Sequence, residues 1–431
     1  MSFGISTRTA IDVGLGGIIA FKTNPPDGFV FAGAAAAYSM RIPAGSPYSG
    51  PLPRVRRSND NAELDIGATG AQVALNRTFA TASGWSLGTG VSYGANQLTF
   101  TNATRIAGQD MGLVTGRSYQ VCVTVNKTGA GPTSAMRLST GNSPSTETGP
   151  FTVIATNPPN GLNVFRATIT ANGPCLVIGA DTNILSGSIN FVSVQEATAI
   201  PGQDAWLDEF ALLGHVGINS GFVTTAYDVS GNGRNATQTT TANQPRIVNA
   251  GVVDTFNNKP AMFNDGTRWL ATAGISALTT GPVTANNVGA FTSIQSYRYF
   301  QSIGDTFAGF QGWTIGAGGA NNNFYASAPG ISNTSGTLLT SNTGFVTTAV
   351  HTGSASSGFV NGTASAGTGN SFTYSVGTAP ITIGGLSAAG TGSAMTGYVQ
   401  EQVYFANTNI STTARQALER NQGAAYGITV A

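Results

Sequence analysis

Short runs in which apolar and polar residues alternate recur along most of the chain, separated by Gly, Asn or Ser. Residues 119–125 (YQVCVTV) form one such run. A period of two predicts half-buried β-strands, and strands that begin roughly every eight to twelve residues are typical of β-sandwiches. We therefore expect an all-β fold in which sandwiches supply most of the structure.

Helical periodicity is nearly absent from the rest of the chain. The pattern predicts one C-terminal helix, which begins after Ser411 as its N-cap and ends near Gly423. A second, short helix is expected over residues 204–213, where apolar residues recur at helical spacing.

The pattern divides the chain into three parts. Residues 1–35 are rich in Gly and Ala without a clear period, which is typical of an extended arm that docks to something larger. Residues 76–203 carry a complete set of predicted strands and are long enough for one jelly roll. Residues 36–75 and 204–431 hold the remaining strands and the terminal helix.

The composition excludes several classes of protein. Charged residues make up 9% of the chain and hydrophobic residues 41%, with 58 Gly and 18 Pro. Ordinary globular proteins carry about 25% charged residues, so small polar side chains must keep this one soluble. The net charge of +1 supplies no field for nucleic acid or an anionic membrane, and we expect neither as a partner. Secreted and virion-type β proteins share this composition.

The apolar run nearest the N-terminus, residues 13–21, is nine residues long. It is too short to span a membrane and lacks the cleavage pattern of a signal peptide. If the protein acts outside a cell, we expect it to leave by lysis or as part of a particle.

Cys122 and Cys175 both lie in strand-like segments. Two buried free thiols are the favoured interpretation, because a free Cys packs as a small hydrophobic side chain. A disulfide across neighbouring strands remains the alternative. With two Cys and two His, far apart, the chain has no metal-ligand spacing, and we expect no cofactor.

Charge is concentrated in residues 54–65 (RVRRSNDNAELD). This segment holds three arginines and three carboxylates, in a chain with 19 basic and 18 acidic residues. Such a density first suggests an active site or a phosphate-binding site. The flanking sequence changes that interpretation.

Two motifs resemble one enzyme family. The segments AYSMR (37–41) and YSGPLPRVRRSNDNAELDI (48–66) resemble the start of the catalytic domain of the α-L-arabinofuranosidase B family. That family continues after a short connection into a segment that resembles FVTTAYDVSGNGRNATQ, found here at 222–238. Weaker similarity extends through NKPAMF (258–263), ITIGG (381–385) and GYVQEQVY (397–404). The resemblance implies a concanavalin A-like sandwich that a second domain interrupts.

The interrupting segment has its own resemblance. It begins with GWSLGTG (84–90) and ends with FVSVQE (191–196), and in style it is similar to the carbohydrate-binding jelly rolls of phage tail proteins. The domain prediction is therefore an arm (1–35), a split sandwich (36–75 plus 204–431) and an inserted jelly roll (76–203).

The carboxylates that the resemblance implies for catalysis are missing from their positions. The family places its acid after a segment like ITIGG, where this chain has Leu386, and no carboxylate occurs in the nucleophile-like segment 313–322. A retaining glycosidase needs two carboxyl groups about 5 Å apart. We expect a protein that is not an enzyme, with arabinofuranosidase-like glycoside hydrolysis as an alternative.

Other candidate constellations have simpler structural interpretations. Asp208, Glu209 and His215 could form an acid/base group, but their spacing on a short helix favours a solvated face with a capping histidine. His351 is expected to be structural, in a hairpin that resembles those of laminin-G-like sandwiches. Asp228 and Asn232 are weak Ca²⁺ candidates, and the family resemblance favours a tight Asx-rich turn for them.

Two sets of residues complete the predicted sites. Candidates for stacking on sugar rings are Trp85, Tyr93, Trp269 and Trp313, each with a core position as its alternative. The resemblance places the charged cluster on the first strand and turn of the sandwich. We therefore expect one structural salt-bridge network, at the seam with the inserted domain, formed by Arg56, Arg57, Asp60 and Asp65.

These observations favour a virion structural protein of a tailed phage, as a tail fibre, spike or surface decoration. It would bind other virion proteins through its arm, contact host-surface glycans and form a homo-oligomer, with a trimer favoured. A decoration protein that only braces the capsid, without glycan binding, is the structural alternative.

Overall fold

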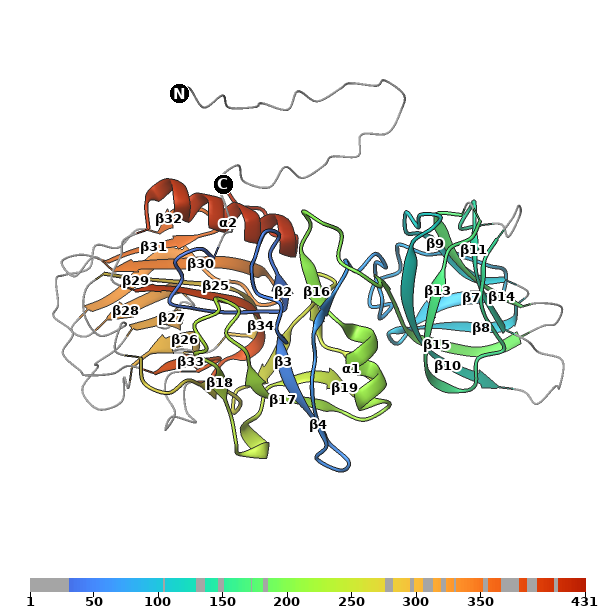
Figure 1. Cartoon of the computed structure of the whole chain (residues 1–431), viewed down its shortest axis with the longest axis horizontal. Coiled ribbons are helices and arrows are strands. Elements are labelled where there is room, and N and C mark those ends of the chain that lie inside the picture. The colour runs from blue at the N-terminus through green and yellow to red at the C-terminus, as the bar shows by residue number, and fades with distance from the viewer. Residues whose placement is uncertain are drawn as a thin grey trace, which may run out of the picture.

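The computed structural model describes residues 31–431 apart from 104, 129–135, 146–150, 172, 181–184, 276–281, 295–297, 305–312, 319–322, 329–330, 352–355, 366–379, 386–393 and 407–409. Regular structure in the described residues is nearly all β, with two α-helices (Figure 1). The prediction of an all-β fold built from sandwiches, with a C-terminal helix, is confirmed. None of the described helices is long and apolar enough to cross a membrane.

The larger part of the molecule contains two runs of paired strands. The first run consists of β1 (Ala36–Ser39), β23 (Met262–Asp265), β34 (Thr396–Ala406), β25 (Val283–Ser293), β30 (Gly344–His351), β31 (Ser356–Val360) and β32 (Thr363–Ser365). β34 pairs with β1 and β23 along one edge and with β25 along the other. β30, β31 and β32 then follow β25 in order, and every pairing is antiparallel.

The second run begins at the N-terminal hairpin. It consists of β4 (Glu63–Asp65), β3 (Pro53–Arg57), β17 (Gly221–Ala226), β18 (Ala236–Thr237), β24 (Leu270–Ala271), β33 (Ile381–Ile383), β26 (Arg298–Ile303), β27 (Trp313–Gly318), β28 (Asn323–Ala328) and β29 (Ile331–Leu338). β19 (Arg246–Asn249) pairs with both β17 and β23 and so joins the two runs. β20 (Val252–Val253) pairs with β19.

One hydrophobic core lies between these runs. Phe291 of β25 and Phe300 of β26 place their ring centroids 4.2 Å apart, and Val403 and Ile303 belong to the same buried cluster. Gln402 of β34 donates to the Phe300 carbonyl across this interior (2.9 Å). Strands before residue 66 and strands after residue 220 therefore pack into a single sandwich.

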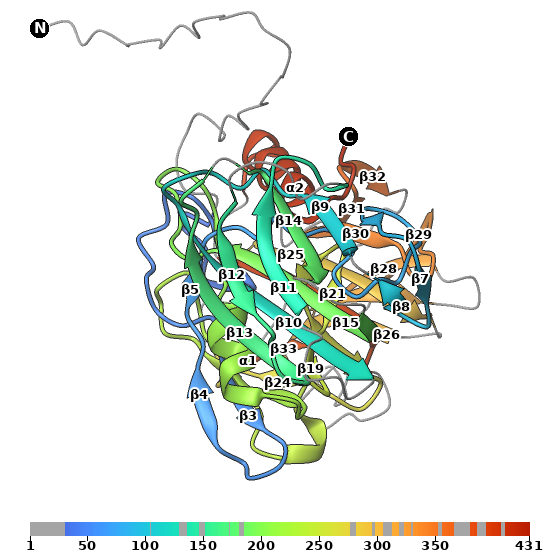
Figure 2. The ribbon, with the colours of Figure 1, turned by 90° about the vertical axis from the view of Figure 1, so that its right-hand side faces the viewer.

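The middle of the chain forms a second sandwich, seen face-on in Figure 2. Its strands are β6 (Ser86–Leu87), β7 (Val91–Gly94), β8 (Gln97–Ala103), β9 (Arg105–Asp110), β10 (Ser118–Thr128), β11 (Met136–Gly141), β12 (Val153–Thr156), β13 (Gly161–Thr168), β14 (Cys175–Ala180) and β15 (Leu185–Glu196). They form two five-stranded sheets, in the orders β13-β10-β15-β8-β7 and β12-β11-β14-β9-β6. Cys122 and Cys175 are buried and free, which confirms the favoured interpretation of these residues as thiols.

A small three-stranded sheet holds the two chain crossings between the sandwiches. Its order is β2 (Arg41–Ile42), β16 (Ala205–Leu207) and β5 (Ala68–Thr69). The predicted helix over 204–213 is therefore wrong in its first part, because Trp206 pairs through its backbone with both neighbouring strands. The helix α1 (Glu209–Val216) begins only after Asp208, whose carboxylate accepts the Ala211 N–H at 2.9 Å.

The C-terminal helix α2 (Thr412–Tyr426) begins after Ser411, as predicted, and Ser411 Oγ accepts the Ala414 N–H. It ends at Gly427, which adopts a left-handed conformation. Gly423 is near the end of the helix, as predicted, but lies within its last turn. A Cβ there would lie 2.5 Å from a side-chain carbon of Val430, so the position serves close packing and does not terminate the helix.

The predicted N-terminal arm falls largely on residues 1–30, which lie outside the described residues. Its last residues belong to the larger sandwich, because Phe31 and Ala34 are buried in the sandwich core. The remaining short elements are the hairpin β21 (Thr255–Phe256) and β22 (Lys259–Pro260), and one 3-10 turn, η1 (Thr241–Asn243).

Candidate functional site

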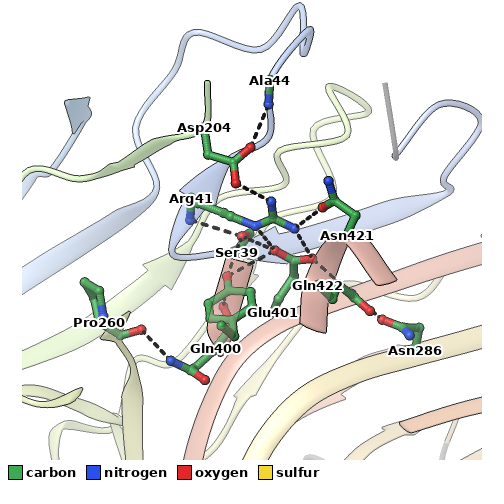
Figure 3. A network of polar contacts seen from close by, with 11 residues as sticks. Ser39, Arg41, Ala44, Asp204, Pro260, Asn286, Gln400, Glu401, Asn421 and Gln422 are labelled. Carbon is green, nitrogen blue, oxygen red and sulfur yellow. Dashed lines mark hydrogen bonds and ion pairs between the residues drawn. The ribbon is translucent and has the colours of Figure 1, made fainter. Parts of the chain in front are cut away.

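The most extensive cluster of buried charge lies beneath α2, around Glu401 of β34 (Figure 3). Glu401 Oε2 accepts hydrogen bonds from Ser39 Oγ (2.8 Å), Arg41 Nε (2.9 Å) and Tyr426 OH (3.0 Å). Its Oε1 accepts from Arg41 Nη2 (3.2 Å) and Gln422 Nε2 (2.9 Å). Both oxygens of this fully buried carboxylate are therefore engaged by donors from two distant parts of the chain, residues 39–41 and α2.

Arg41 is the cation at the centre of the cluster, and its side chain is 0% exposed. Besides Glu401, it donates from Nη1 to Asp204 Oδ2 and from Nη2 to Asn421 Oδ1, both at 2.6 Å. Burial lowers the pKa of Arg41, but the charges of Glu401 and Asp204 outweigh burial and raise this pKa above its usual range. The guanidinium is therefore held in its charged form and bonded to β34, α2 and the segment before β16.

Polar contacts continue from this cluster along the helix. Gln422 Nε2 donates to Asn286 Oδ1 of β25 (2.5 Å), and Asn286 Nδ2 donates to Thr348 Oγ1 of β30 (2.9 Å). Thr348 Oγ1 in turn donates to Glu419 Oε1 (2.7 Å), and Glu419 forms an ion pair with Arg415 one turn earlier. Hydrogen bonds and ion pairs, together with apolar contacts, thus fix α2 on the outer face of the sheet.

The cluster brings two carboxylates to one place, as a retaining glycosidase requires. Such an enzyme needs an open space of about 5 Å between its carboxyl groups, where the sugar can react. Here the Arg41 guanidinium fills the position between Asp204 and Glu401. The arrangement is suited to joining chain segments and leaves no position for a substrate between these two carboxylates.

A second buried ion pair lies at the junction of the two sandwiches. Arg77, just before the inserted strands, pairs with Glu209 of α1, and both side chains are buried. Ser193 Oγ of β15 donates to Glu209 Oε2 (2.7 Å), and Gln72 Nε2 donates to Ser193 Oγ (2.6 Å). The guanidinium of Arg77 also lies 5.7 Å from the ring centroid of Phe191. These groups form the polar contact between the two sandwiches, the place where we expected the charged hairpin.

This geometry corrects the expectation of a solvated face on α1. Glu209 is fully buried at the seam, because the strands of the inserted sandwich pack against that side of the helix. Asp208 serves as the N-cap, and a ring nitrogen of His215 lies 3.2 Å from the Val55 carbonyl oxygen. The three residues therefore have separate partners and do not form an acid/base group.

The charged N-terminal hairpin holds separate contacts instead of one network. Arg57 pairs with Asp60 (2.6 Å), and Asp65 pairs with Arg54 (2.7 Å) across the β3–β4 ladder. Arg56 donates instead to amide oxygens of other residues. The predicted four-residue network is wrong because alternate residues of β3 face opposite ways and the partners lie on one short hairpin, which projects away from the inserted sandwich (Figure 1).

The predicted sugar-stacking residues do not gather in one place. Trp85 is buried in the inserted sandwich, where its Nε1 donates to the Leu75 carbonyl, and Tyr93 OH bonds to the Trp85 backbone. Trp269 is half-buried in the larger sandwich. Trp313 lies on β27, but its side chain is outside the described residues. Trp85 therefore has the core position that was its alternative.

Asp228 and Asn232 form the predicted turn. Asp228 Oδ1 accepts from the backbone N–H groups of Ala37 (2.9 Å) and Ser230 (3.0 Å), and its Oδ2 accepts from Arg234 N–H (3.0 Å). The Asn232 amide nitrogen donates to the Ala34 carbonyl at 2.9 Å. Within the residues that the structure describes, no group of three or more His, Cys, Asp and Glu could hold a metal ion.

His351 ends β30 and pairs in register with Ser356 of β31, in the predicted hairpin. It is fully buried, and burial lowers its pKa to about 3. The imidazole is therefore neutral at neutral pH.

Sequence reasoning missed Arg41, Asp204, Glu401 and Arg77 as members of buried clusters. Their partners are far away in the sequence, with 360 positions between Arg41 and Glu401. One signal was available: Arg41 and Glu401 are single charges within strand-like segments of a chain that otherwise avoids charge. Such isolated charges indicate a buried ionic cluster better than a dense charged run does.

Comparison with known proteins yields similarity of fold only. No protein family matches the sequence, and no curated protein matches it significantly. A GH54 α-L-arabinofuranosidase soaked with a cyclic sulfate inhibitor is 14% identical with a TM-score of 0.41, over 76% of this chain and 63% of that chain. A Trypanosoma rangeli sialidase in complex with sialic acid is 11% identical with a TM-score of 0.36, over 77% of this chain and 62% of that one.

A third similar structure is domain 4 of AbnA, a GH43 extracellular arabinanase from Geobacillus stearothermophilus, in complex with arabinotriose. It is 9% identical with a TM-score of 0.32, over 38% of this chain and 77% of that domain. This chain thus spans less than two thirds of the length of the arabinofuranosidase and the sialidase.

Proposed function

We propose that this chain is a non-enzymatic structural protein of a virion, as a tail fibre, spike or surface decoration, that contacts host-surface glycans. The observation that carries the non-enzymatic part is the engagement of its carboxylates. In the described part of the chain, the carboxylates in ion pairs with arginine are those of Asp60, Asp65, Glu196, Asp204, Glu209, Asp254, Asp265, Glu401 and Glu419.

Three of the four other described carboxylates are also engaged by this chain. Asp110, Asp208 and Asp228 accept backbone N–H groups that lie two to six residues further along the chain. Glu63 is exposed on the edge strand β4. A glycosidase needs one carboxyl group that exchanges a proton with the substrate and another that faces the sugar. Asp228 stands in one of the two motifs that resemble the arabinofuranosidase family, and Glu401 stands in a segment of weaker similarity. Both are saturated by donors of this chain.

Support for glycan contact comes from the resemblance of both sandwiches to carbohydrate-handling domains and from a surface with few charges. Attachment to other virion proteins through residues 1–35 and assembly into a homotrimer belong to the same proposal. An N-terminal segment rich in Gly and Ala and a chain of low charge suit a protein that works within a larger particle.

Two assays on the purified full-length chain test the proposal. We expect retention of the protein on part of a glycan array, and no release of arabinose from an aryl α-L-arabinofuranoside. Hydrolysis that disappears in Glu401→Gln or Asp228→Asn, while the variant still folds, would overturn the non-enzymatic part. Binding to capsids without retention on any glycan would replace glycan contact with the bracing role.

A further inference from the structure

A row of alternating arginine and aromatic side chains crosses five neighbouring strands of the larger sandwich. In register, Arg56 of β3 lies opposite Phe222 of β17, and Phe222 lies opposite Arg246 of β19. Arg246 then lies opposite Phe263 of β23, and Phe263 opposite Tyr398 of β34. Residues that are directly opposite each other in antiparallel strands point to the same face of the sheet. We call these five residues the arginine–aromatic row.

The row is on the outer face of the sandwich. The neighbours of its members along the strands, among them Val55, Val223 and Ile247, belong to the hydrophobic core. Since side chains alternate along a strand, the row must face away from that core. Apart from Arg56, which is 8% exposed, its members are half-buried, so their rings and guanidinium groups reach the surface.

Contacts along the row are close. The Arg56 guanidinium carbon lies 5.1 Å from the ring centroid of Phe222, and that of Arg246 lies 4.7 Å from the ring centroid of Phe263. The rings of Phe263 and Tyr398 are 5.3 Å apart. Cation–π and ring contacts of this kind fix the side chains, so the row offers its surface with little loss of side-chain entropy on binding.

Charge along the row is balanced at Arg246 and left unbalanced at Arg56. Arg246 donates from Nε and Nη2 to Asp254 (2.7 and 3.0 Å). Arg56 instead donates to neutral amide oxygens, those of Gln244 (2.7 Å) and Asn61 (2.8 Å). Burial of a cation that bonds only to neutral groups costs desolvation free energy. An anion that binds such a cation therefore gains a favourable electrostatic interaction.

A second cation lies beside Arg56. The Arg268 guanidinium carbon is 4.9 Å from the same Phe222 ring, and Arg268 Nη1 donates to the Gln244 carbonyl. Burial lowers the pKa of Arg56, and the charge of Arg268 lowers it further. Glu63 stands opposite Arg56 on β4 and acts in the other direction, but the two side chains form no ion pair and the pKa of Arg56 stays lowered. Asp265 pairs with Arg268 and not with Arg56.

We propose that the arginine–aromatic row, together with Arg268, binds a carboxylate-bearing sugar of a host glycan. The carboxylate accepts hydrogen bonds from the guanidinium groups of Arg56 and Arg268, whose planar donors match the two oxygens of a carboxylate. The carbon face of the sugar packs against the exposed edges of the Phe222 and Phe263 rings. This inference rests on the proposed glycan-contacting function and names the class of glycan and the place of contact.

Titration calorimetry of the full-length protein tests the inference with two acidic probes, oligogalacturonate and oligosialic acid, and with methyl-esterified oligogalacturonate as the neutral match. We expect binding of at least one acid and weaker binding of the ester. Charge-assisted hydrogen bonds contribute about 1.5–3 kcal/mol each, so Arg56→Gln and Arg268→Gln should each weaken binding on the order of tenfold or more.

Arg117→Gln is the matched control. Arg117 is an exposed arginine of the inserted sandwich that pairs with Glu196, away from the row, and its loss should leave the affinity unchanged. The thermal transition of each variant shows that it has folded, and Arg268→Gln carries the test if Arg56→Gln does not fold.

The outcomes separate the inference from the proposed function. Equal affinity for the acid and its ester, or equal loss in Arg117→Gln and Arg268→Gln, would overturn the row as the site while glycan contact stands. Retention of neutral glycans alone on the array has the same consequence. Absence of binding to every glycan, acidic or neutral, would overturn both.

Discussion

The N-terminal hairpin and the cluster beneath α2 use the same types of charged residue in opposite ways. The hairpin has its charges close together in the sequence, and its Arg54–Asp65 pair is 43% and 39% exposed. The cluster collects Arg41, Asp204 and Glu401 from distant segments, and Arg41 and Glu401 are both 0% exposed. Local density of charge therefore identified the more exposed of the two groups.

Solvent explains the difference between the two regions. An exposed pair loses little when it is broken, because water solvates each partner, and such pairs contribute about 0–1 kcal/mol. A buried pair adds little net stability either, but removal of one partner leaves the other charge without water or counter-charge, at a cost of about 3–5 kcal/mol. The following changes test how far this contrast holds.

Glu401→Ala should have the largest effect. It removes the carboxylate that accepts from Ser39, Arg41, Gln422 and Tyr426, and leaves Asp204 as the remaining counter-charge of the buried Arg41 guanidinium. We expect the free energy of unfolding of the larger sandwich to fall by about 3–5 kcal/mol in urea denaturation.

A double variant shows whether charge or packing is responsible. Arg41→Met combined with Glu401→Leu replaces the pair with apolar side chains, and exchanges of this kind are often tolerated. We expect it to be more stable than Glu401→Ala. If it is equally or less stable, lost shape and lost hydrogen bonds to Ser39 and Tyr426 are the cause, and the contrast with the hairpin is not one of charge.

His351 extends the comparison to a buried group without net charge. Its pKa is lowered to about 3 in the folded protein by burial, whereas an unfolded histidine titrates near 6.5. Between these two values the unfolded chain binds a proton that the folded chain does not, so stability falls as the pH drops from 6.5 toward 3. The slope is up to about 1.4 kcal/mol per pH unit.

Urea unfolding of the native chain and of His351→Gln at pH 7, 6, 5 and 4 measures this slope. We expect the difference in stability between them to shift in favour of the variant by that slope at each step below pH 6.5. Parallel curves for the two proteins would mean that His351 is not buried as the neutral form.

The smallest effect is expected at the hairpin. Asp65→Asn removes the ion pair with Arg54 and weakens the hydrogen bond from Tyr227 OH, and should lower the free energy of unfolding by less than about 1 kcal/mol. The difference should shrink further at high salt, because salt screens exposed charges. A loss as large as that of Glu401→Ala, measured in the same urea experiment, would remove the contrast between the two regions.

Local signals in the sequence predicted the local features of the fold. Alternation predicted strands, Ser411 predicted the start of α2, and the motif around Asp228, through its family resemblance, predicted its turn. Each depends on residues a few positions apart. Gly423 indicated the last turn of α2 but not its final residue, because this glycine is required by the packing of Val430, which follows the helix and gives no periodic signal.

The buried clusters depend on register between distant strands and could not be predicted in the same way. Ser39 faces Glu401 because β1 and β34 pair with these residues opposite each other. Arg77 meets Glu209 only when the inserted sheet packs on α1. A local pattern reveals neither the strand pairing nor the packing on α1. For this reason the contact between the sandwiches was predicted at the hairpin, where charges are adjacent in the chain.

The small sheet at the crossings has a mechanical consequence. The chain leaves the larger sandwich at β5 and returns at β16, and Trp206 of β16 pairs with both Thr69 and Arg41. Entry and exit of the inserted sandwich are thus fastened side by side. A pulling force applied between the two ends of the chain reaches the inserted sandwich only after these strands have separated. While these strands stay paired, tension between the chain ends should not act on the inserted sandwich, which should therefore stay folded.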